Sequence, residues 1–295
     1  MHRQSVSQAA CDSRLPTTNT QSLTLLVDGV YCGAMNSARE TVVEVEGLSY
    51  SYDAFEALHG VAFRIQQGEI VGLLGPNGAG KTTTIKLVAG ILSSSRGRIQ
   101  VAGFHLPQQH LEAKKVTGFV PESAGLYECL SGKEFLELSG RLQGVEEKVL
   151  QTKIRVLLEI FDLHNVRVAR IAGYSKGMRQ KILLSAALLH NPKVLLLDEP
   201  LSGLDVASSI LIKDLLAALA AQGKTILYSS HVLDVVEKVC NRALIIDGGN
   251  LIADAPLDEL KSRTMENSLE SVFRKLTHSE DTKPKVERVL EILPL

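Results

Sequence analysis

The sequence lacks several features that would place it in a familiar class. Its 295 residues include four cysteines, which lie far apart and form no C-x-x-C pair: Cys11, Cys32, Cys129 and Cys240. This spacing argues against a disulfide framework and against a zinc site, and it fits a reducing compartment. The formal net charge is −1, so the chain has no overall field that would favour nucleic acid or anionic lipid.

Long apolar runs are also missing. No stretch approaches the roughly 18 apolar residues of a membrane-spanning helix, and the nearest candidates, LTLLVDGV and KILLSAALL, are short and interrupted by polar residues. The N-terminal region has no clear apolar segment followed by a small-residue cleavage site, as a secretion signal would require. We therefore expect any role at a membrane to depend on another polypeptide.

Residues 1–41 are rich in Ser, Thr, Gln and Asn and have no sustained periodicity, which predicts disorder. Met35 stands just before the first patterned segment, and we hypothesise that translation starts there, residues 1–34 being a misread extension. Peptides from residues 1–34 in a mass spectrum of the native protein would refute this. Residues 278–295 are interpreted as a short C-terminal tail.

From residue 42 onward, segments typical of strands alternate with segments typical of helices. The run Ile70–Leu74 is almost wholly apolar, as expected for a strand buried on both faces, and further strands are predicted at 194–197, 225–228 and 243–246. Between about 130 and 170, a helical pattern carries one apolar stripe, formed by Leu150, Ile154, Leu157, Leu158 and Phe161. This alternation predicts an α/β fold with a mainly parallel sheet flanked by helices.

The strongest motif is GLLGPNGAGKTTT, which contains a buried strand's end and precedes a predicted helix. It matches G-x-x-x-x-G-K-T, a phosphate-binding loop, in the context that supports this interpretation. Glycines let backbone N–H groups converge on phosphate oxygens, Lys81 adds a charge for the β- and γ-phosphates, and the Thr82 hydroxyl can ligate Mg²⁺. A chance glycine-rich turn is the less favoured alternative. The predicted loop comprises Gly75, Pro76, Asn77, Gly78, Ala79, Gly80, Lys81 and Thr82.

An acidic pair follows another apolar strand in KVLLLDEPLSGLD. In open α/β sheets, carboxylates at the carboxyl end of a strand lie where ligands bind. Asp198 is placed to hold Mg²⁺ through water, and Glu199 to act as the general base that polarises the attacking water. The alternative is a solvated acidic turn, which the phosphate loop upstream makes less favoured.

These residues resemble the nucleotide-binding subunit of ATP-binding-cassette (ABC) transporters, over about residues 42–277. The resemblance implies a P-loop NTPase core, an N-terminal antiparallel β subdomain and an inserted α-helical subdomain at about 123–180. It implies that Thr83 also belongs to the nucleotide loop, and that Tyr52 stacks on adenine, with Tyr50 as the alternative. It further implies that His231, in YSSHVLDVVE, contacts the γ-phosphate and that Asp205, in SGLD, lies in a loop at a dimer interface.

The stretch YSKGM, at positions 174–178, stands where the family has a signature usually written LSGGQ. Ser175 is predicted to cap the helix that follows. The buried face of that helix is expected to comprise Met178, Ile182, Ala186 and Leu189. The resemblance implies that the signature binds the γ-phosphate of a nucleotide held by a second subunit. The residues expected to act in this way are Ser175, Lys176, Gly177 and Met178.

One residue departs from the family pattern in a way that bears on the site. Glu122, in TGFVPESAGLY, stands where the family usually has glutamine. A carboxylate can still ligate Mg²⁺ or orient water, but it adds negative charge near the γ-phosphate. We keep Glu122 as a third candidate metal ligand beside Thr82 and Asp198.

The function that the resemblance implies is hydrolysis of ATP with Mg²⁺, coupled to transport through a separate membrane permease at the cytoplasmic face of a membrane. A second ATP-binding subunit, expected to be another copy of this chain, would complete each site, and no nucleic-acid partner is expected. The stretches YSKGMRQK and SLESVFRKLT resemble the exporter-type branch of the family.

Two alternatives remain open. A soluble cassette protein acting on ribosomes or DNA is less favoured because the chain has a single cassette, no sustained heptads and near-neutral charge. A regulatory nucleotide binder without hydrolysis is less favoured because the chain retains Lys81, Asp198, Glu199 and His231. The transported substrate is not encoded in these motifs, since the permease would carry that specificity.

Overall fold

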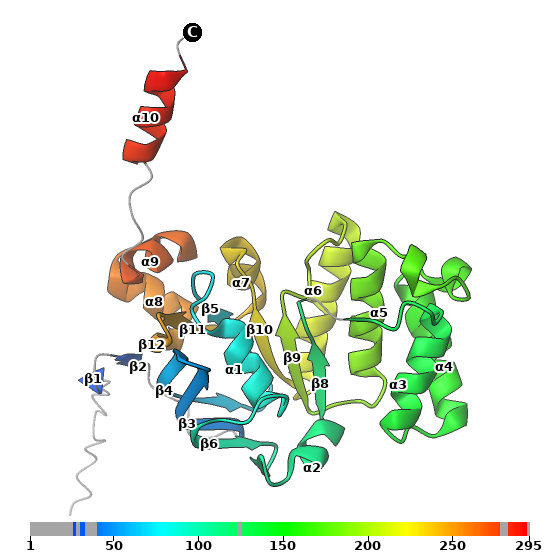
Figure 1. Cartoon of the computed structure of the whole chain (residues 1–295). Helices are drawn as coiled ribbons and strands as arrows, with labels where there is room; N and C mark the ends of the chain where they lie inside the picture. Colours follow the sequence, from blue (N-terminus) through cyan, green and yellow to red (C-terminus); the bar gives the residue numbers. More distant parts are fainter. Residues whose placement is uncertain (1–25, 28–29, 33–39, 123–124, 278–282, 294–295) are drawn as a thin grey trace, which may run out of the picture.

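The computed structural model describes residues 26–27, 30–32, 40–122, 125–277 and 283–293, and its elements form two sheets with helices around them (Figure 1). The larger sheet has the strand order β1-β2-β12-β11-β5-β10-β9-β8. Its strands are β1 (Leu26–Val27), β2 (Val30–Cys32), β5 (Ile70–Leu74), β8 (Thr117–Val120), β9 (Val194–Asp198), β10 (Thr225–Ser229), β11 (Arg242–Asp247) and β12 (Asn250–Pro256).

The centre of this sheet is parallel. Strands β11, β5, β10, β9 and β8 run side by side in one direction, while β12 pairs antiparallel with β11. This confirms the predicted α/β fold with a mainly parallel sheet. Parallel strands are joined by crossovers, so their carboxyl ends all lie at one edge. The phosphate loop, Glu122, Glu199 and His231 follow four of these strands at that edge.

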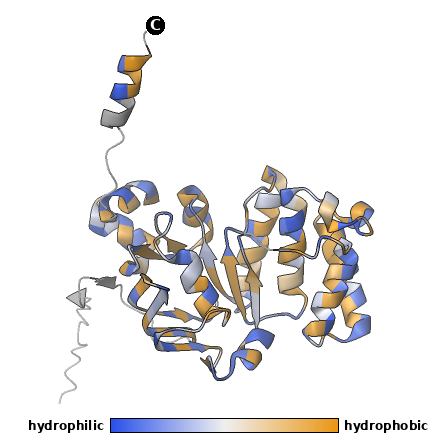
Figure 2. Cartoon of the chain, in the orientation of Figure 1, coloured by the Kyte–Doolittle hydropathy of each residue, from blue (hydrophilic) through white to orange (hydrophobic). Residues whose placement is uncertain are grey.

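Strands β5, β9 and β10 are buried on both faces. Ile70 and Leu74 of β5 belong to an apolar cluster with the helices α4 to α7, whereas Val71 and Leu73 belong to one with the smaller sheet. Successive side chains of a strand point to opposite faces, so each face of the sheet has its own cluster. Figure 2 shows hydrophobic residues concentrated along these central strands. Their continuous apolar runs follow from two covered faces.

The smaller sheet is antiparallel, with the order β4-β3-β6-β7. Its strands are β3 (Thr41–Tyr52), β4 (Phe55–Gln66), β6 (Arg96–Val101) and β7 (Phe104–Leu106). This confirms the expected N-terminal antiparallel β subdomain. Helix α1 (Lys81–Val88) contacts strands of both sheets, β4 and β9 among them, so it lies between them.

Helices cover the outer faces of the larger sheet (Figure 1). The described helices are α2 (His110–Lys115), α3 (Gly132–Leu142), α4 (Glu147–Ile160), α5 (Lys176–Leu188), α6 (Val206–Ala221), α7 (Leu233–Val239), α8 (Leu257–Thr264), α9 (Leu269–Leu276) and α10 (Lys283–Ile292), with short 3-10 turns at His164–Val166 and Ile171–Gly173. Helix α10 does not belong to this cover, because it lies away from the sheets in Figure 1. Within the described part of the chain, none of these helices combines the length and the apolar character needed to cross a membrane.

Helices α3 and α4 lie in the segment expected to be a helical subdomain. Ser131 caps α3, since its hydroxyl accepts a hydrogen bond from the Glu134 N–H at 3.2 Å while the Glu134 carboxylate accepts one from the Ser131 N–H at 2.8 Å. This reciprocal pair satisfies two backbone donors that a helix start leaves open. In α4 the predicted stripe faces the apolar cluster, with Leu157 partly buried and the others buried: Leu150, Ile154, Leu158 and Phe161.

Helix α5 is buried on more sides than a single stripe predicts. Ser175 caps it as predicted, because its hydroxyl accepts a hydrogen bond from the Met178 N–H at 3.2 Å. The expected buried face is wrong in part: Met178 and Ala186 are only partly buried. Residues outside that face are buried instead, namely Gln180, Lys181, Leu183, Leu184 and Ser185. Helix α5 contacts α3, α4 and β8, so neighbours cover it from several directions.

The disorder expected for residues 1–41 does not hold for two short strands. Strands β1 and β2 pair with each other, and β2 adds to β12 with Tyr31 opposite Ala253. The β12 edge would otherwise present unpaired backbone groups, and β2 pairs with part of it. Met35, the hypothetical start, lies outside the described residues.

The packing of α4 on α3 allows a test of stability. Leu150 is fully buried, and a Cβ added to Gly140 of α3 would lie 2.2 Å from Leu150 Cδ1. We expect Leu150→Ala to lower the free energy of unfolding by about 2–5 kcal/mol, because it leaves a cavity in the apolar cluster. Val149→Ala, on the exposed side of the same helix, is expected to change it by less than about 0.5 kcal/mol. Urea unfolding followed by circular dichroism measures both, and equal losses would contradict this packing.

Candidate nucleotide-binding site

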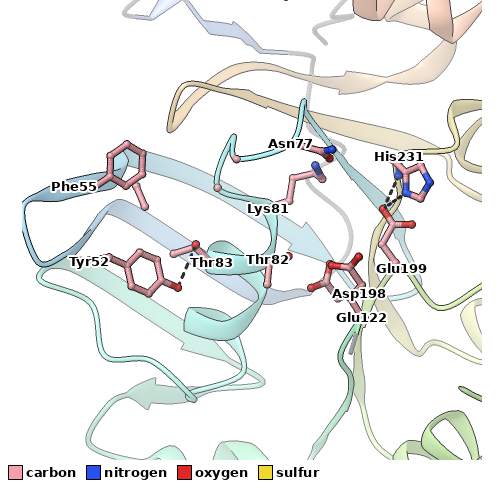
Figure 3. Close-up of a pocket in the computed structure, with 13 residues that line it drawn as sticks. Tyr52, Phe55, Asn77, Lys81, Thr82, Thr83, Glu122, Asp198, Glu199 and His231 are labelled. Atoms are coloured by element: carbon pink, nitrogen blue, oxygen red, sulfur yellow. Dashed lines mark hydrogen bonds and ion pairs between the residues drawn. The ribbon is translucent and has the colours of Figure 1, made fainter. Parts of the chain in front are cut away.

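A pocket of about 460 Å³ lies at the carboxyl edge of the parallel sheet (Figure 3). It is bounded by the phosphate loop, by the β3–β4 hairpin and by the ends of β8, β9 and β10. Its lining residues are Tyr52, Phe55, Ala57, Asn77, Gly78, Gly80, Lys81, Thr82, Thr83, Glu122, Asp198, Glu199 and His231. The structure therefore brings residues from five separate stretches of the sequence into one hollow.

The phosphate loop is shaped by close contacts at two glycines. Gly80 precedes α1 with a φ of 108°, and a Cβ there would lie 2.9 Å from the Ala57 carbonyl oxygen. A Cβ on Gly75 would lie 2.3 Å from the Ile246 carbonyl oxygen. Glycine is required at both positions because any side chain would collide with backbone. The predicted loop residues that do not line the pocket are Gly75, Pro76 and Ala79.

Lys81, the first residue of α1, closes over this loop. Its ammonium group donates hydrogen bonds to the carbonyl oxygens of Gly75, at 2.8 Å, and Pro76, at 3.0 Å. Partial burial lowers the pKa of Lys81, and nearby carboxylates act in the opposite direction, those of Glu199, Asp198 and Glu122. Lys81 thus brings a cation into a pocket whose opposite wall is acidic.

Two acidic side chains at the end of β9 are held by residues that end or follow β10. Asp198 is buried and accepts a hydrogen bond from Ser229 Oγ. Glu199 is also buried, and its carboxylate accepts hydrogen bonds from Ser230 Oγ at 3.3 Å and from the His231 N–H at 2.7 Å. Sequence reasoning missed both serines. The signal lay in the register of the two parallel strands, which sets Ser229 opposite Asp198.

The Glu199 side chain is constrained from its backbone as well. Its φ of 50° lies in the left-handed region, which is uncommon for a residue with a long side chain. Residues held in this region often occur at functional sites. The exposed His231 ring places Nδ1 at 2.7 Å from Glu199 Oε1, and Nε2 has no partner among the described residues. The ring therefore keeps one nitrogen available for another group in the pocket.

Aromatic rings form the end of the pocket opposite the acids (Figure 3). Of the two tyrosines considered for adenine, Tyr52 lines the pocket and Tyr50 does not; Tyr50 meets the Tyr52 ring edge-on, with centroids 4.8 Å apart. Sequence reasoning missed Phe55, which lines the same end and is 65% exposed. Its signal was the hairpin turn, which pairs Phe55 directly with Tyr52. The Tyr52 hydroxyl lies 3.5 Å from Thr83 Oγ1.

The signature residues lie outside this pocket. None of Ser175, Lys176, Gly177 and Met178 belongs to its lining. Ser175 is exposed at the start of α5, and its hydroxyl oxygen accepts from the Met178 N–H, which leaves the O–H free to donate. The structure therefore does not bring the signature and the phosphate loop of one chain together in one site.

Asp205 caps helix α6 and also lies outside the pocket. Its carboxylate accepts hydrogen bonds from the Ser208 N–H at 2.8 Å and from Ser208 Oγ at 2.7 Å, and these bonds lower the pKa of Asp205 to about 2. Lys181 Nζ lies 3.7 Å from the same carboxylate. Three residues before Asp205, Ser202 Oγ accepts a hydrogen bond from Lys176 Nζ at 2.7 Å. The signature helix and the loop 201–205 are thus joined by polar contacts.

The sequence is similar to a known protein family and to several known proteins. The family model described as ABC transporter matches residues 58–202. The uncharacterized ABC transporter ATP-binding protein YxlF of Bacillus subtilis (strain 168) is 38% identical over 250 residues, which cover 84% of this chain and 83% of that protein. The daunorubicin resistance ATP-binding protein DrrA3 of Streptomyces coeruleorubidus is 34% identical over 235 residues, 80% of this chain and 74% of that protein.

Solved structures agree in fold. An ATP-binding subunit of an ABC transporter superposes with a TM-score of 0.76 at 32% identity, over 80% of this chain and 100% of that chain. The ATP-binding cassette MJ0796, a dimer in a post-hydrolysis state bound to ADP and Pi, gives a TM-score of 0.67 at 20% identity, over 73% of this chain and 98% of that chain. At that identity the second likeness concerns the fold alone.

The resemblance drawn from the motifs is thereby confirmed at the level of the family. The match to YxlF extends well beyond the phosphate loop, over most of both chains. The chain therefore belongs to the ATP-binding proteins of the ABC transporter family, and it is an ATPase.

Proposed function

We propose that this chain binds Mg²⁺ and ATP in the pocket and uses hydrolysis to drive export of a substrate through a separate membrane permease. The observation that carries the proposal is the Glu199 carboxylate, which two donors hold at a pocket whose other wall is the phosphate loop (Figure 3). ATP hydrolysis in support of transport with a partner follows from family membership. Residue roles, export direction and the identity of the partners belong to the proposal.

The phosphate loop binds the triphosphate in this proposal. Asn77, Gly78 and Gly80 line the pocket at the positive end of α1, and their backbone N–H groups are suited to phosphate oxygens. Lys81 exchanges its two carbonyl partners for the β- and γ-phosphates. Thr83, beside the Tyr52 hydroxyl, contacts the phosphate nearest the ribose.

Oxygen ligands from the chain fit Mg²⁺ at this end of the pocket. The Thr82 hydroxyl and the Asp198 carboxylate would hold the ion, with Glu122 as a further oxygen donor. Mg²⁺ usually keeps several waters and binds phosphates, so it needs few protein ligands. This fits the described residues, which contain no group of three or more His, Cys, Asp or Glu side chains arranged for a metal. When bound, the ion offsets negative charge on the phosphates.

Glu199 acts as the general base in this proposal. Hydrogen bonds from Ser230 and His231 aim its carboxylate, which takes a proton from the water that attacks the γ-phosphate. The remaining ring nitrogen of His231 contacts a γ-phosphate oxygen in this proposal. The reaction transfers the γ-phosphoryl group to water, yielding ADP and inorganic phosphate.

A second subunit completes each site. The signature residues lie outside the pocket of their own chain, yet Ser175 keeps a free O–H at a positive helix end, suited to a γ-phosphate. We therefore propose that the signature residues, Ser175 and Gly177 above all, bind the nucleotide held by a second copy of this chain. Asp205, in the loop joined to the signature helix, lies at the same dimer interface. ATP then promotes association by mass action, because it binds fully only between two chains.

Export is the direction that relatives favour. DrrA3 is named for daunorubicin resistance, and its sequence aligns with 80% of this chain. In the proposal the permease holds the chain at the cytoplasmic face of a membrane. The alternative, a cassette protein acting on ribosomes or DNA, has no support from the relatives described above: YxlF is an ABC transporter ATP-binding protein by name, and DrrA3 is named for drug resistance.

Substitutions at Glu199 and Lys81 separate hydrolysis from binding. Glu199→Gln should retain ATP affinity and lower the hydrolysis rate by about 10²–10⁴-fold, because the amide cannot accept the proton. Lys81→Ala should mainly lose ATP affinity, since it removes the loop's cation. Calorimetry and phosphate release measure the two effects, with Glu159→Gln on exposed α4 as a control expected to match wild type. Equal loss of ATP affinity in both variants would contradict these roles.

The signature is tested by Ser175→Arg. We expect the monomer to bind ATP almost as wild type does but to lose ATP-driven dimerisation, because the bulky cation blocks the partner's nucleotide. Ser175→Asp is a matched variant that keeps a capping oxygen yet repels phosphate, so it should also remain monomeric without loss of thermal stability. Sedimentation with ATP measures the oligomeric state of each variant, made in a chain that also carries Glu199→Gln so that ATP is not hydrolysed. Dimers of either variant would rule out the composite site.

The aromatic end is tested by Tyr52→Ala and Phe55→Ala. A stacked base contributes about 1–3 kcal/mol, so loss of the Tyr52 ring should raise the ATP dissociation constant at least about fivefold, with a smaller effect at Phe55. Affinity for inorganic tripolyphosphate, which has no base, should stay unchanged. Tyr127→Ala, an exposed ring outside the pocket, is the control. A parallel loss of tripolyphosphate affinity would indicate damage to the loop instead of loss of stacking.

A further inference from the structure

Two residues of this chain differ in charge from the family motifs. Lys176 stands at the first glycine of the LSGGQ pattern, and Glu122 stands at the usual glutamine. One adds a positive charge and the other a negative charge. We infer that in the ATP-bound dimer the ammonium group of Lys176 on one chain lies beside Glu122 and the γ-phosphate on the other and balances their charge. This inference rests on the proposed two-subunit site.

Among the described residues, Glu122 has no hydrogen-bonding or ionic partner, unlike the other two acids of the pocket. Asp198 accepts a hydrogen bond from Ser229, and Glu199 accepts two from residues after β10. Glu122 is exposed at the pocket, and among the described residues it has no hydrogen bond or ion pair. Glu122 and Lys81 line the same pocket, and the Glu122 carboxylate acts electrostatically on the Lys81 ammonium group.

The pocket is therefore short of positive charge for a triphosphate. The described residues that line it include three carboxylates and one lysine or arginine, Lys81. ATP adds several negative charges to the pocket, and Mg²⁺ offsets them only in part. Like charges at close range repel strongly where water is excluded. Glutamine at position 122 would avoid one unit of this repulsion. Since this chain has Glu122, the closed site gains stability from any cation that the partner supplies.

Lys176 is the one cation of helix α5 for which the described part of the chain supplies no acidic partner. Near the start of α5, Arg179 pairs with Glu128 at 2.7 Å and Lys181 with Asp205 at 3.7 Å. Lys176 Nζ instead donates to a neutral hydroxyl, Ser202 Oγ. Its side chain is exposed and follows Ser175 directly, at the end of α5 that the proposed function turns towards the partner's nucleotide.

In the single chain, the hydrogen bond to Ser202 keeps the Lys176 side chain against loop 201–205. Its stem lies over Gly203, where an added Cβ would be 2.8 Å from Lys176 Cγ. In the closed dimer the Lys176 ammonium group exchanges the Ser202 hydroxyl for the Glu122 carboxylate and the γ-phosphate of the other chain. This exchange favours the dimer, because hydrogen bonds between charged groups are about twice as strong as neutral ones. The competing explanation is structural: Lys176 would matter only by tying loop 201–205 to α5.

A double-mutant cycle on the full chain separates the two explanations. Every variant carries Glu199→Gln, so that ATP persists, and the dimer dissociation constant with Mg²⁺ and ATP is measured by sedimentation. We expect Lys176→Gln to raise that constant about tenfold and Lys176→Arg to leave it near the parent value. In a chain that also carries Glu122→Gln, Lys176→Gln should raise the dimer dissociation constant by less than about threefold. High salt should reduce the effect of Lys176→Gln in the parent, because it screens the charges. Ser202→Ala should not weaken the dimer.

Three results would overturn the inference. If Lys176→Gln costs the same with Glu122 or glutamine at position 122, the two charges do not interact. If Ser202→Ala weakens the dimer as much as Lys176→Gln, the lysine acts through its own loop. A parent that stays monomeric with ATP would overturn the two-subunit site itself and this inference with it.

Discussion

Burial of the parallel strands on both faces is the constraint on which the rest of the structure depends. Strands β5, β9 and β10 lie between two apolar clusters, so their side chains cannot carry chemistry along most of their length. Polar groups become possible only where these strands end, and parallel strands end at the same edge. The nucleotide pocket lies at this carboxyl edge, where the chain leaves the buried strands.

The residues at this edge are held by contacts between neighbouring strand ends. Ser229 and Ser230 of one strand end fix Asp198 and Glu199 of the next. Because each acid depends on a residue from another strand, the geometry of the site is a property of the sheet register. Ser202 in loop 201–205 connects the end of β9 to the signature helix. Its N–H donates to the Glu199 carbonyl oxygen at 3.1 Å, and its hydroxyl accepts a hydrogen bond from Lys176.

Much of this organisation follows from short stretches of sequence, and the misses share one cause. The apolar runs, the phosphate loop and the Ser175 cap depend on residues close together in the chain, so their patterns are sufficient. Phe55, Ser229 and Ser230 enter the site through pairing across a hairpin or between distant strands, which a linear pattern does not encode. The extra burial of α5 and the pairing of β2 with β12 likewise depend on neighbours that the local sequence does not identify.

The hydrogen bonds from Lys81 to the carbonyl oxygens of Gly75 and Pro76 have a consequence for the entropy of binding. The loop already has its curved form with the lysine bridging its backbone, and the close approach of Gly75 to Ile246 leaves it little room to collapse. Ordering a loop residue costs about 1–2 kcal/mol of conformational free energy. In this chain the phosphate loop is ordered when the domain folds. Nucleotide binding therefore loses little free energy to ordering of the loop.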